Sequence, residues 1–181
     1  MQLRAAADAS FAMHLDGKSH TGTAIWFGML NAPVLVGVKK QTLVTRSSSE
    51  AEMVALCSVA EEVMWFRWLL EEIGFPQKTT IVEQDNKSVI QMQEAGPGKV
   101  GRGRYINVKF YFVHDLIQDK HIALTYVATD TMIADGLTKG LVGSKFVSWT
   151  RRLLNDHGFF DSGKVEDRGR RPGKRARVGG D

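Results

Sequence analysis

The stretch SSSEAEMVALCSVAEEVMWFRWLLEEI, residues 47–73, predicts the longest helix of the chain. Apolar residues recur in it at intervals of three, four and seven positions, which places them on one face of a helix. The serines at its start are favoured N-cap residues, and Gly74 and Pro76 mark its end. We therefore expect one continuous helix over this stretch.

Strand-like segments lie on both sides of this helix. They are rich in apolar and β-branched residues and cover residues 3–12, 23–30, 33–39, 79–83 and 122–127. Asp16-Gly17 and Asn31-Ala32 lie between the first three segments, and Asp-Gly is a common turn pair. The first three segments therefore predict a meander of antiparallel strands.

Shorter helices are expected in the second half of the chain. Their predicted ranges are residues 88–94, 106–118, 132–141 and 145–154, and a glycine-rich basic loop at 99–104 separates the first two. The alternation of strands and helices, without an internal repeat, predicts one mixed α/β domain over residues 1–160.

The charge of the chain is concentrated at its C-terminal end. The 181 residues carry a formal net charge of +4. Residues 162–181 hold seven Lys or Arg against three acids, which also gives +4, so that residues 1–161 are formally neutral. Because residues 161–181 have almost nothing apolar to bury, we expect a disordered basic tail. Such a tail either adds affinity for nucleic acid, serves as a nuclear-import signal, or is only a solvated extension.

Compartment is indicated by what the sequence lacks. The single cysteine, Cys57, lies among apolar residues at helical spacing and is expected to be a core residue in a reducing compartment. No apolar run approaches the roughly 18 residues of a transmembrane helix, and the N-terminus lacks a signal-peptide pattern. We expect an intracellular protein, and the strand that begins at residue 3 suggests a fragment of something longer.

Four acidic residues, Asp8, Glu52, Asp85 and Asp135, lie where predicted strands end or helices begin. Hard divalent cations prefer oxygen ligands, and two such ions held close together need several carboxylates from different elements. The four acids therefore indicate a two-metal site that hydrolyses a phosphodiester.

Helix capping offers another explanation for the acids near residue 50. Glu52 lies three residues after Ser49, and Glu50 has the same relation to Ser47. This is the spacing of a capping box, in which the glutamate bonds back to the helix start.

The three aspartates differ in how well capping explains them. Asp85 is a candidate N-cap, and Asp135 is a candidate favourable charge at a helix N-terminus. Asp8 stands in a run of alanines within a predicted strand, where Asp is depleted. Taken together, the four acids favour the metal site over four separate caps.

Other motifs are weak. Residues 96–101 match GxGxxG, but they follow a helix and contain a proline, so a dinucleotide site is rejected. The histidines have no metal-ligand spacing with each other or with the cysteine, and we expect ordinary surface or loop residues there: His14, His20, His114, His121 and His157.

Five sequence blocks resemble the ribonuclease H domain of Ty1/copia-type retrotransposon Pol polyproteins, of the reverse transcriptase/ribonuclease H family. They are ADASFAMHLDGKSHTG at 7–22, SSSEAEMVAL at 47–56, QDNKSVI at 84–90, RYINVKFYFVHD at 104–115 and IADGLTK at 133–139. The resemblance implies a ribonuclease H-like fold, a five-stranded mixed sheet flanked by helices. It also implies endonucleolytic hydrolysis of the RNA strand of RNA/DNA hybrids.

By this resemblance Asp8, Glu52, Asp85 and Asp135 are the catalytic acids and the metal ligands. Glu50 competes with Glu52 as the helix acid, and Glu52 is chosen because an apolar helical stretch follows it. The cofactors implied are two Mg²⁺ ions, with Mn²⁺ as an alternative. One ion would activate the attacking water, and the other would stabilise the leaving 3′ oxygen.

Substrate contacts are expected to be with the backbone and the minor groove of the hybrid. Asn86 is the candidate for the minor groove, and the candidates for phosphates are Lys99, Arg102, Arg104 and Lys109. A solvated basic loop explains these cations equally well. The resemblance also implies a reverse transcriptase domain of the same polyprotein as partner, and no membrane.

The pattern departs from the wider ribonuclease H family in the loop before the last acid. Residues 128–132 read ATDTM and contain no histidine that could assist product release. A degenerate or domesticated hybrid-binding domain, an integrase or transposase core, and a purely structural domain remain alternatives. Location is expected to be cytoplasmic or in a virus-like particle, or nuclear through the tail.

Overall fold

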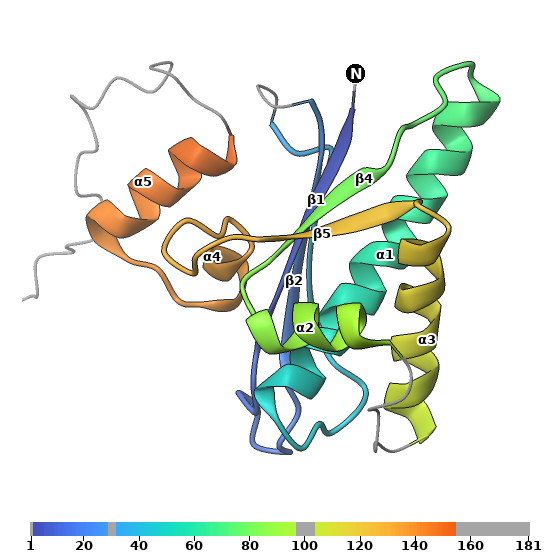
Figure 1. Ribbon diagram of the computed structural model, residues 1–181. Coiled ribbons are helices and arrows are strands. Elements are labelled where there is room, and N and C mark those ends of the chain that lie inside the picture. The colour runs from blue at the N-terminus through green and yellow to red at the C-terminus, as the bar shows by residue number, and fades with distance from the viewer. Residues whose placement is uncertain (1, 29–31, 97–103, 155–181) are drawn as a thin grey trace, which may run out of the picture.

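The computed structural model describes residues 2–28, 32–96 and 104–154 (Figure 1), and for Arg104 and Tyr105 it describes the backbone only. The strands are β1 (Leu3–Ser10), β2 (His20–Phe27), β3 (Leu35–Lys40), β4 (Thr80–Gln84) and β5 (Ile122–Tyr126). The helices are α1 (Ser48–Glu72), α2 (Lys87–Ala95), α3 (Arg104–Gln118), α4 (Asp135–Thr138) and α5 (Gly143–Leu153). The predicted tail, the boundary at residue 160, Lys99 and Arg102 lie outside the described residues.

One mixed sheet forms the centre of the molecule, with strand order β3-β2-β1-β4-β5. β1 pairs with β2 and β2 with β3 antiparallel, whereas β4 is parallel to both β1 and β5. The predicted meander and the five-stranded mixed sheet of an α/β fold are confirmed.

One face of the sheet carries the main core, because α1 and α3 pack against it (Figure 1). Alternate residues of the strands point to this face, and Leu3 and Ile25 are fully buried there. They meet Met53 of α1 in the same cluster as Phe110 of α3, which is also fully buried. Burial of such side chains supplies most of the stability of a domain.

The opposite face is covered by the segment from Met132 to α5. Its core is small and is built from Ala6 and Ala24 of the sheet with Trp26, Met132 and Leu153. In Figure 1, α4 and α5 lie on the side of the sheet away from α1. The short side chains of the strands allow the covering segment to approach closely.

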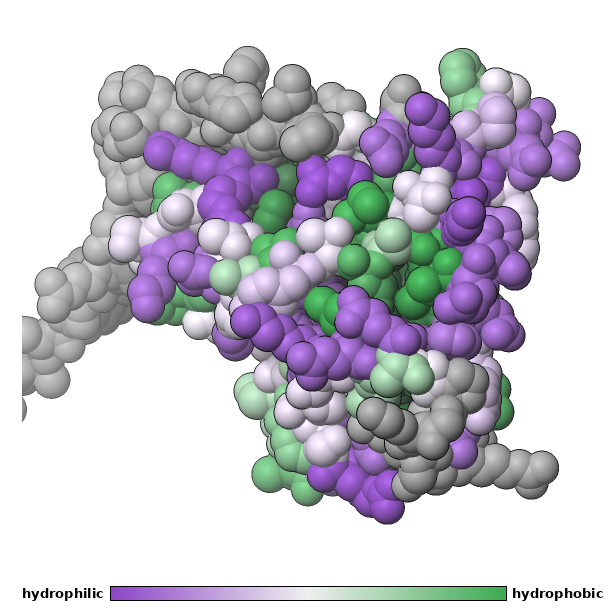
Figure 2. Space-filling view, in the orientation of Figure 1, coloured by the Kyte–Doolittle hydropathy of each residue, from purple (hydrophilic) through white to green (hydrophobic). Residues whose placement is uncertain are grey.

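Hydrophilic residues cover most of the surface seen in Figure 2. In that view hydrophobic residues gather beside β5 and the helices α1 and α3. β5 is the last strand at its edge of the sheet, and Tyr126 at its end is 45% exposed. No described helix is long and apolar enough to cross a bilayer.

The expected helix over residues 132–141 is wrong. Only Asp135–Thr138 is helical, and Lys139 already has an extended backbone. Gly136 and Gly140 disfavour a longer helix here. A side chain at Gly136 would also collide with Trp149, because an added Cβ would lie 2.1 Å from its indole nitrogen. Packing against α5 therefore requires a glycine at position 136, although glycine disfavours a helix.

The other element boundaries differ from expectation by a few residues. β1 ends at Ser10, because the chain turns at Ala12, whose φ of 50° is incompatible with a strand. β2 begins at His20, three residues before its predicted start, and residues 29–30 of its predicted range lie outside the described residues. The remaining helices and strands begin and end within about two residues of the prediction.

Candidate metal centre

The parallel pairing of β1 with β4 sets the position of the first two acids. The register pairs Arg4 to Ala6 with Ile81 to Glu83, so Asp8 on β1 lies beyond the last paired residue. Asp85 follows the last residue of β4 directly. Because parallel strands end at the same edge of a sheet, the two aspartates meet there.

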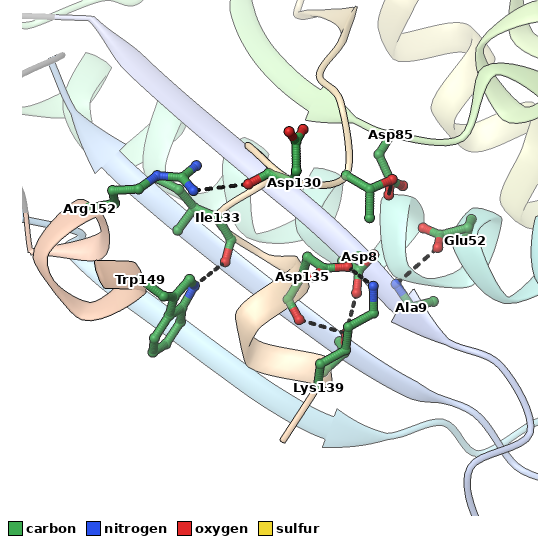
Figure 3. A network of polar contacts seen from close by, with 12 residues as sticks. Asp8, Ala9, Glu52, Asp85, Asp130, Ile133, Asp135, Lys139, Trp149 and Arg152 are labelled. Atoms are coloured by element: carbon green, nitrogen blue, oxygen red, sulfur yellow. Dashed lines mark hydrogen bonds and ion pairs between the residues drawn. The ribbon is translucent and has the colours of Figure 1, made fainter. Parts of the chain in front are cut away.

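Three carboxylates converge at this edge. Asp8, Glu52 and Asp85 each offer an oxygen, and these oxygens lie within 4.8 Å of one another. Glu52 extends from the second turn of α1, and its Oε1 accepts a hydrogen bond of 3.2 Å from the backbone N–H of Ala9 (Figure 3). A contact across 43 residues of chain therefore holds the α1 acid against the end of β1.

Glu50 has a different role from Glu52. Its carboxylate accepts from the backbone N–H of Arg46 at 2.8 Å and pairs with the Arg46 guanidinium at 3.2 Å. The Ser47 side chain in turn caps the backbone N–H of Glu50, so these residues close the start of α1. Capping thus accounts for Glu50, while Glu52 turns toward the aspartates.

Asp135 approaches Asp8 from the other side (Figure 3). It is the first residue of α4, and its carboxylate forms an ion pair with the ammonium of Lys139. The Thr138 hydroxyl donates a hydrogen bond to Asp8 and lies 3.2 Å from the backbone oxygen of Asp135, a second acceptor for the same hydrogen. Asp135 is therefore tied to Asp8 through α4 but lies outside the group of three within 4.8 Å.

Gly22 allows this approach. It lies directly opposite Asp8 on β2, and a Cβ there would stand 2.8 Å from Leu137 and 3.1 Å from the backbone oxygen of Ala134. Only a glycine leaves room for α4 against the sheet at this point.

Burial makes ionisation of the cluster costly. The pKa of Asp8 is raised to about 6, chiefly by burial, while the bond from Thr138 opposes the shift. The pKa of Glu52 is raised to about 9, first by burial and then by the charges of Asp8 and Asp85. Several carboxylates held together at a cost in free energy, with raised pKa values, are typical of a functional site.

The donor set fits a hard divalent cation. All the converging atoms are carboxylate oxygens. Hard cations such as Mg²⁺, Mn²⁺ and Ca²⁺ prefer oxygen ligands, whereas softer metals prefer nitrogen or sulfur. Oε2 of Glu52 is buried and makes no hydrogen bond within the described part of the chain, so it is available as a ligand. A bound cation would also offset the mutual repulsion that, after burial, contributes to these raised pKa values.

Asn86 and Asp85 divide two tasks at the start of α2. Asn86 is the N-cap, and its side-chain oxygen accepts from the backbone N–H groups of Ser88 and Val89. Asp85, which capping could have explained, instead accepts a hydrogen bond of 2.9 Å from the hydroxyl of Thr129. The cap bonds orient the Asn86 amide beside the cluster.

The expected phosphate contacts are less well placed. Lys109 lies on α3 with its ammonium 3.8 Å from the sulfur of Cys57 on α1, so it faces another helix. Cys57 is buried in the main core as expected. The side chain of Arg104 and all of Lys99 and Arg102 are outside the described residues.

Two of the histidines expected to be ordinary surface or loop residues contact each other, and His157 of that set lies outside the described residues. Nε2 of His14 lies 2.9 Å from Nδ1 of His20, and the rings stack with centroids 5.1 Å apart. The contact arises because the turn after β1 folds His14 back onto the first residue of β2. Sequence spacing alone could not show this. In the described part of the chain, the three acids form the one His, Cys or carboxylate group suited to a metal.

Three residues that contact the acid cluster were not predicted from the sequence, although two of them lie in one of the five sequence blocks. Thr138 and Lys139 belong to IADGLTK at residues 133–139, where only the aspartate was singled out. Thr129 stands in the loop noted only for its missing histidine. The contacts of Thr138 with Asp8 and of Thr129 with Asp85 depend on long-range packing, whereas Lys139 pairs with Asp135 four residues away.

Comparison with known sequences finds relatives among retrotransposon polyproteins, while no protein-family model matches. The Pol polyprotein of transposon TNT 1-94 from Nicotiana tabacum is 28% identical over 145 residues, covering 80% of this chain. That of transposon RE2 from Arabidopsis thaliana is 28% identical over 155 residues, covering 84%. The Ty1-JR2 Gag-Pol polyprotein of Saccharomyces cerevisiae is 26% identical over 150 residues, covering 82%. The matched segment spans only 11%, 10% and 8% of these relatives, respectively.

Comparison with solved structures finds ribonucleases H. LC11-RNase H1 from compost matches with a TM-score of 0.56 at 16% identity, covering 75% of this chain and 91% of that one. Its complex with an RNA/DNA hybrid gives 0.57 at 14% identity, covering 75% and 93%. RNase H1 of Halobacterium salinarum gives 0.51 at 17% identity, covering 74% and 91%. The chain is thus a homologue of the copia- and Ty1-type retrotransposon Pol polyproteins, and it has the fold of ribonuclease H.

Proposed function

We propose that this chain is a metal-dependent ribonuclease H, which hydrolyses the RNA strand of RNA/DNA hybrids as one part of a Pol polyprotein. The observation that carries the proposal is the convergence of Asp8, Glu52 and Asp85 within 4.8 Å, from β1, α1 and the end of β4. A structural domain would gain nothing from holding three mutually repelling carboxylates together, two of them buried. The ribonuclease H fold and the polyprotein relatives support the same activity.

The residues of the chain would divide the work. Asp8, Glu52 and Asp85 would hold divalent cations, with Asp135 as a further ligand on the α4 side. Two Mg²⁺ ions at this centre would activate a water and stabilise the leaving 3′ oxygen. Thr129 would keep Asp85 oriented, and Asn86, fixed by its cap bonds, would face the minor groove of the hybrid.

The partner within the polyprotein would be the reverse transcriptase domain. The chain matches about a tenth of the length of its relatives, so most of each polyprotein lies outside the matched segment. Since residues 1–161 are formally neutral, tethering to a polymerase would add to the substrate affinity of the domain by raising the local concentration of hybrid. A cytoplasmic or particle-associated location follows from this assignment.

The test is cleavage of a labelled RNA/DNA hybrid by the full chain in Mg²⁺ or Mn²⁺. We expect metal-dependent cutting of the RNA strand and none of duplex DNA, and Asp85→Asn should lower the rate at least 100-fold. The matched control is Asp130→Asn, because Asp130 points away from the cluster in Figure 3.

The outcomes separate the alternatives. Loss of cleavage in Asp85→Asn but not in Asp130→Asn supports the nuclease and the role of Asp85. Hybrid binding by the wild-type chain without any cleavage would favour the degenerate hybrid-binding domain. Cleavage of duplex DNA would favour an integrase-like or transposase-like core.

A further inference from the structure

Lys139 occupies a position at the acid cluster that its ion pair with Asp135 does not fully explain. Its side chain is 51% exposed, whereas that of Asp135 is 16% exposed. The ammonium is therefore more accessible to solvent than the carboxylate it binds. Figure 3 shows Lys139 beside Asp8 as well as Asp135.

The backbone holds Lys139 in this place. Lys139 ends α4, and its N–H donates to the backbone oxygen of Asp135 at 3.1 Å. The preceding residue, Thr138, donates to Asp8. The lysine stem thus starts from a segment that is tied to the cluster at two points, while the ammonium at its far end can move.

The ion pair itself is of a kind that exchanges easily. Lys139 and Asp135 are four residues apart with the lysine half-exposed, and such pairs contribute little to stability. Asp135 can therefore pass from Lys139 to another cation without disrupting the fold.

Charge balance then identifies a ligand for the lysine, on the basis of the proposed function. The carboxylates of Asp8, Glu52, Asp85 and Asp135 carry four negative charges when ionised, which two divalent cations would neutralise. The positive charge of Lys139 would be left without a counterion. A phosphodiester, with one negative charge, is the group that restores neutrality in the same place.

We infer that Lys139 is a substrate-binding residue, whose ammonium transfers from Asp135 to a backbone phosphate of the nucleic-acid strand at the acid cluster. In the absence of metal and substrate it neutralises Asp135. When both are present it contributes one phosphate contact, next to the bond that is cut.

The test measures hybrid binding by the full chain in Ca²⁺, which takes the same oxygen ligands. The substrate is checked for integrity after each titration. Variants are Lys139→Gln, which removes the charge, and Lys139→Arg, which keeps it. Lys78→Gln is the matched control, because it removes an exposed lysine just before β4, at the opposite end of that strand from Asp85.

We expect Lys139→Gln to weaken hybrid binding roughly three- to tenfold. The slope of log K against log salt should become shallower by about 0.9, the value for one phosphate contact. Lys139→Arg and Lys78→Gln should keep the wild-type slope. An unchanged slope in Lys139→Gln would overturn the phosphate contact and leave the nuclease assignment standing. A wild-type chain that does not bind hybrid at all would overturn both.

A second readout excludes a purely structural role. Calorimetric titration with Mn²⁺ alone should show Lys139→Gln binding the metal at least as tightly as the wild type, because a competitor for Asp135 has been removed. Loss of Mn²⁺ binding in this variant would mean that Lys139 orients Asp135, and the phosphate contact would be overturned.

Discussion

The two faces of the sheet differ in the size of the side chains that fill them. The face under α1 and α3 is filled with large side chains such as Met53, Leu56 and Phe110, all fully buried. The face under α4 and α5 uses Ala6, Ala24 and other residues in a much smaller cluster.

This difference suggests that one face stabilises the domain while the other positions α4 at the acid cluster. The first face buries enough apolar surface to hold the domain together. The second face replaces side-chain volume with close backbone approach, which brings α4 to Asp8. Variants on the two faces should therefore differ in whether they lose the fold or the site.

The largest effect is expected from Phe110→Ala on the first face. Phe110 of α3 is fully buried in the main core, so the cavity should lower the free energy of unfolding by about 3–5 kcal/mol. Urea denaturation followed by circular dichroism measures this loss. The control is Phe146→Ala on α5, a residue 48% exposed, which should cost less than about 1 kcal/mol. Equal losses in both variants would contradict the comparison.

The second prediction concerns the stability of the metal-free protein against pH. The pKa of Asp8 is about 6 instead of 3.8, and that of Glu52 is about 9 instead of 4.5, so the folded state binds these protons more tightly than the unfolded state. The resulting stability is fully present below about pH 4 and is lost as pH rises through 6 and then 9. We therefore expect unfolding in a chelator to become easier between pH 5 and pH 9.

Asp8→Asn should reduce this dependence. The shift of the Asp8 pKa corresponds to about 3 kcal/mol, so the variant should be more stable than the wild type by up to about that amount at pH 8. It should at the same time lose hybrid cleavage. Saturating Mg²⁺ should stabilise the wild type more than the variant. If the variant is less stable than the wild type at pH 8 without metal, then the ionised carboxylate of Asp8 does not destabilise the folded protein.

The smallest effect on stability, but a large one on the site, is expected from Gly22→Ala on the second face. The new Cβ would stand 2.8 Å from Leu137 and 3.1 Å from a backbone oxygen, so α4 must shift away from Asp8. Overpacking of this kind costs about 1–3 kcal/mol, and cleavage should fall by at least tenfold because Asp135 moves with α4. Gly140→Ala is the control, since a Cβ there meets nothing within 4 Å.

Melting temperature and cleavage rate should be measured on the same samples. If Gly22→Ala retains full activity, the close approach of α4 is not needed for the site.

Local sequence patterns predicted most of the helices and strands. The apolar spacing of residues 47–73 predicted α1 almost to its ends, because a long helix with a serine cap is decided by neighbours in sequence. The helix expected at residues 132–141 was wrong, because only Asp135–Thr138 is helical and Lys139 is already extended. The prediction did not take account of Gly136 and Gly140, which disfavour a helix.

The candidate site shows the same division. Spacing and residue type singled out Asp8, Asp85 and Asp135, but they left Glu50 and Glu52 as alternatives. Both glutamates have capping spacing, and only the position of α1 against β1 shows which of them faces Asp8. The roles of all four acids as catalytic ligands remain predictions that the cleavage assay will test.

The sequence alone determines three features, because each depends on local periodicity or on composition. They are the order of strands and helices, the acids at the ends of these elements, and the contrast between formally neutral residues 1–161 and the basic tail. Only the tertiary structure decides the pairing of β1 with β4, the choice of Glu52 and the approach of Thr138 to Asp8. They depend on contacts across tens of residues, whose free energy exists only when the sheet has formed and both of its faces are covered.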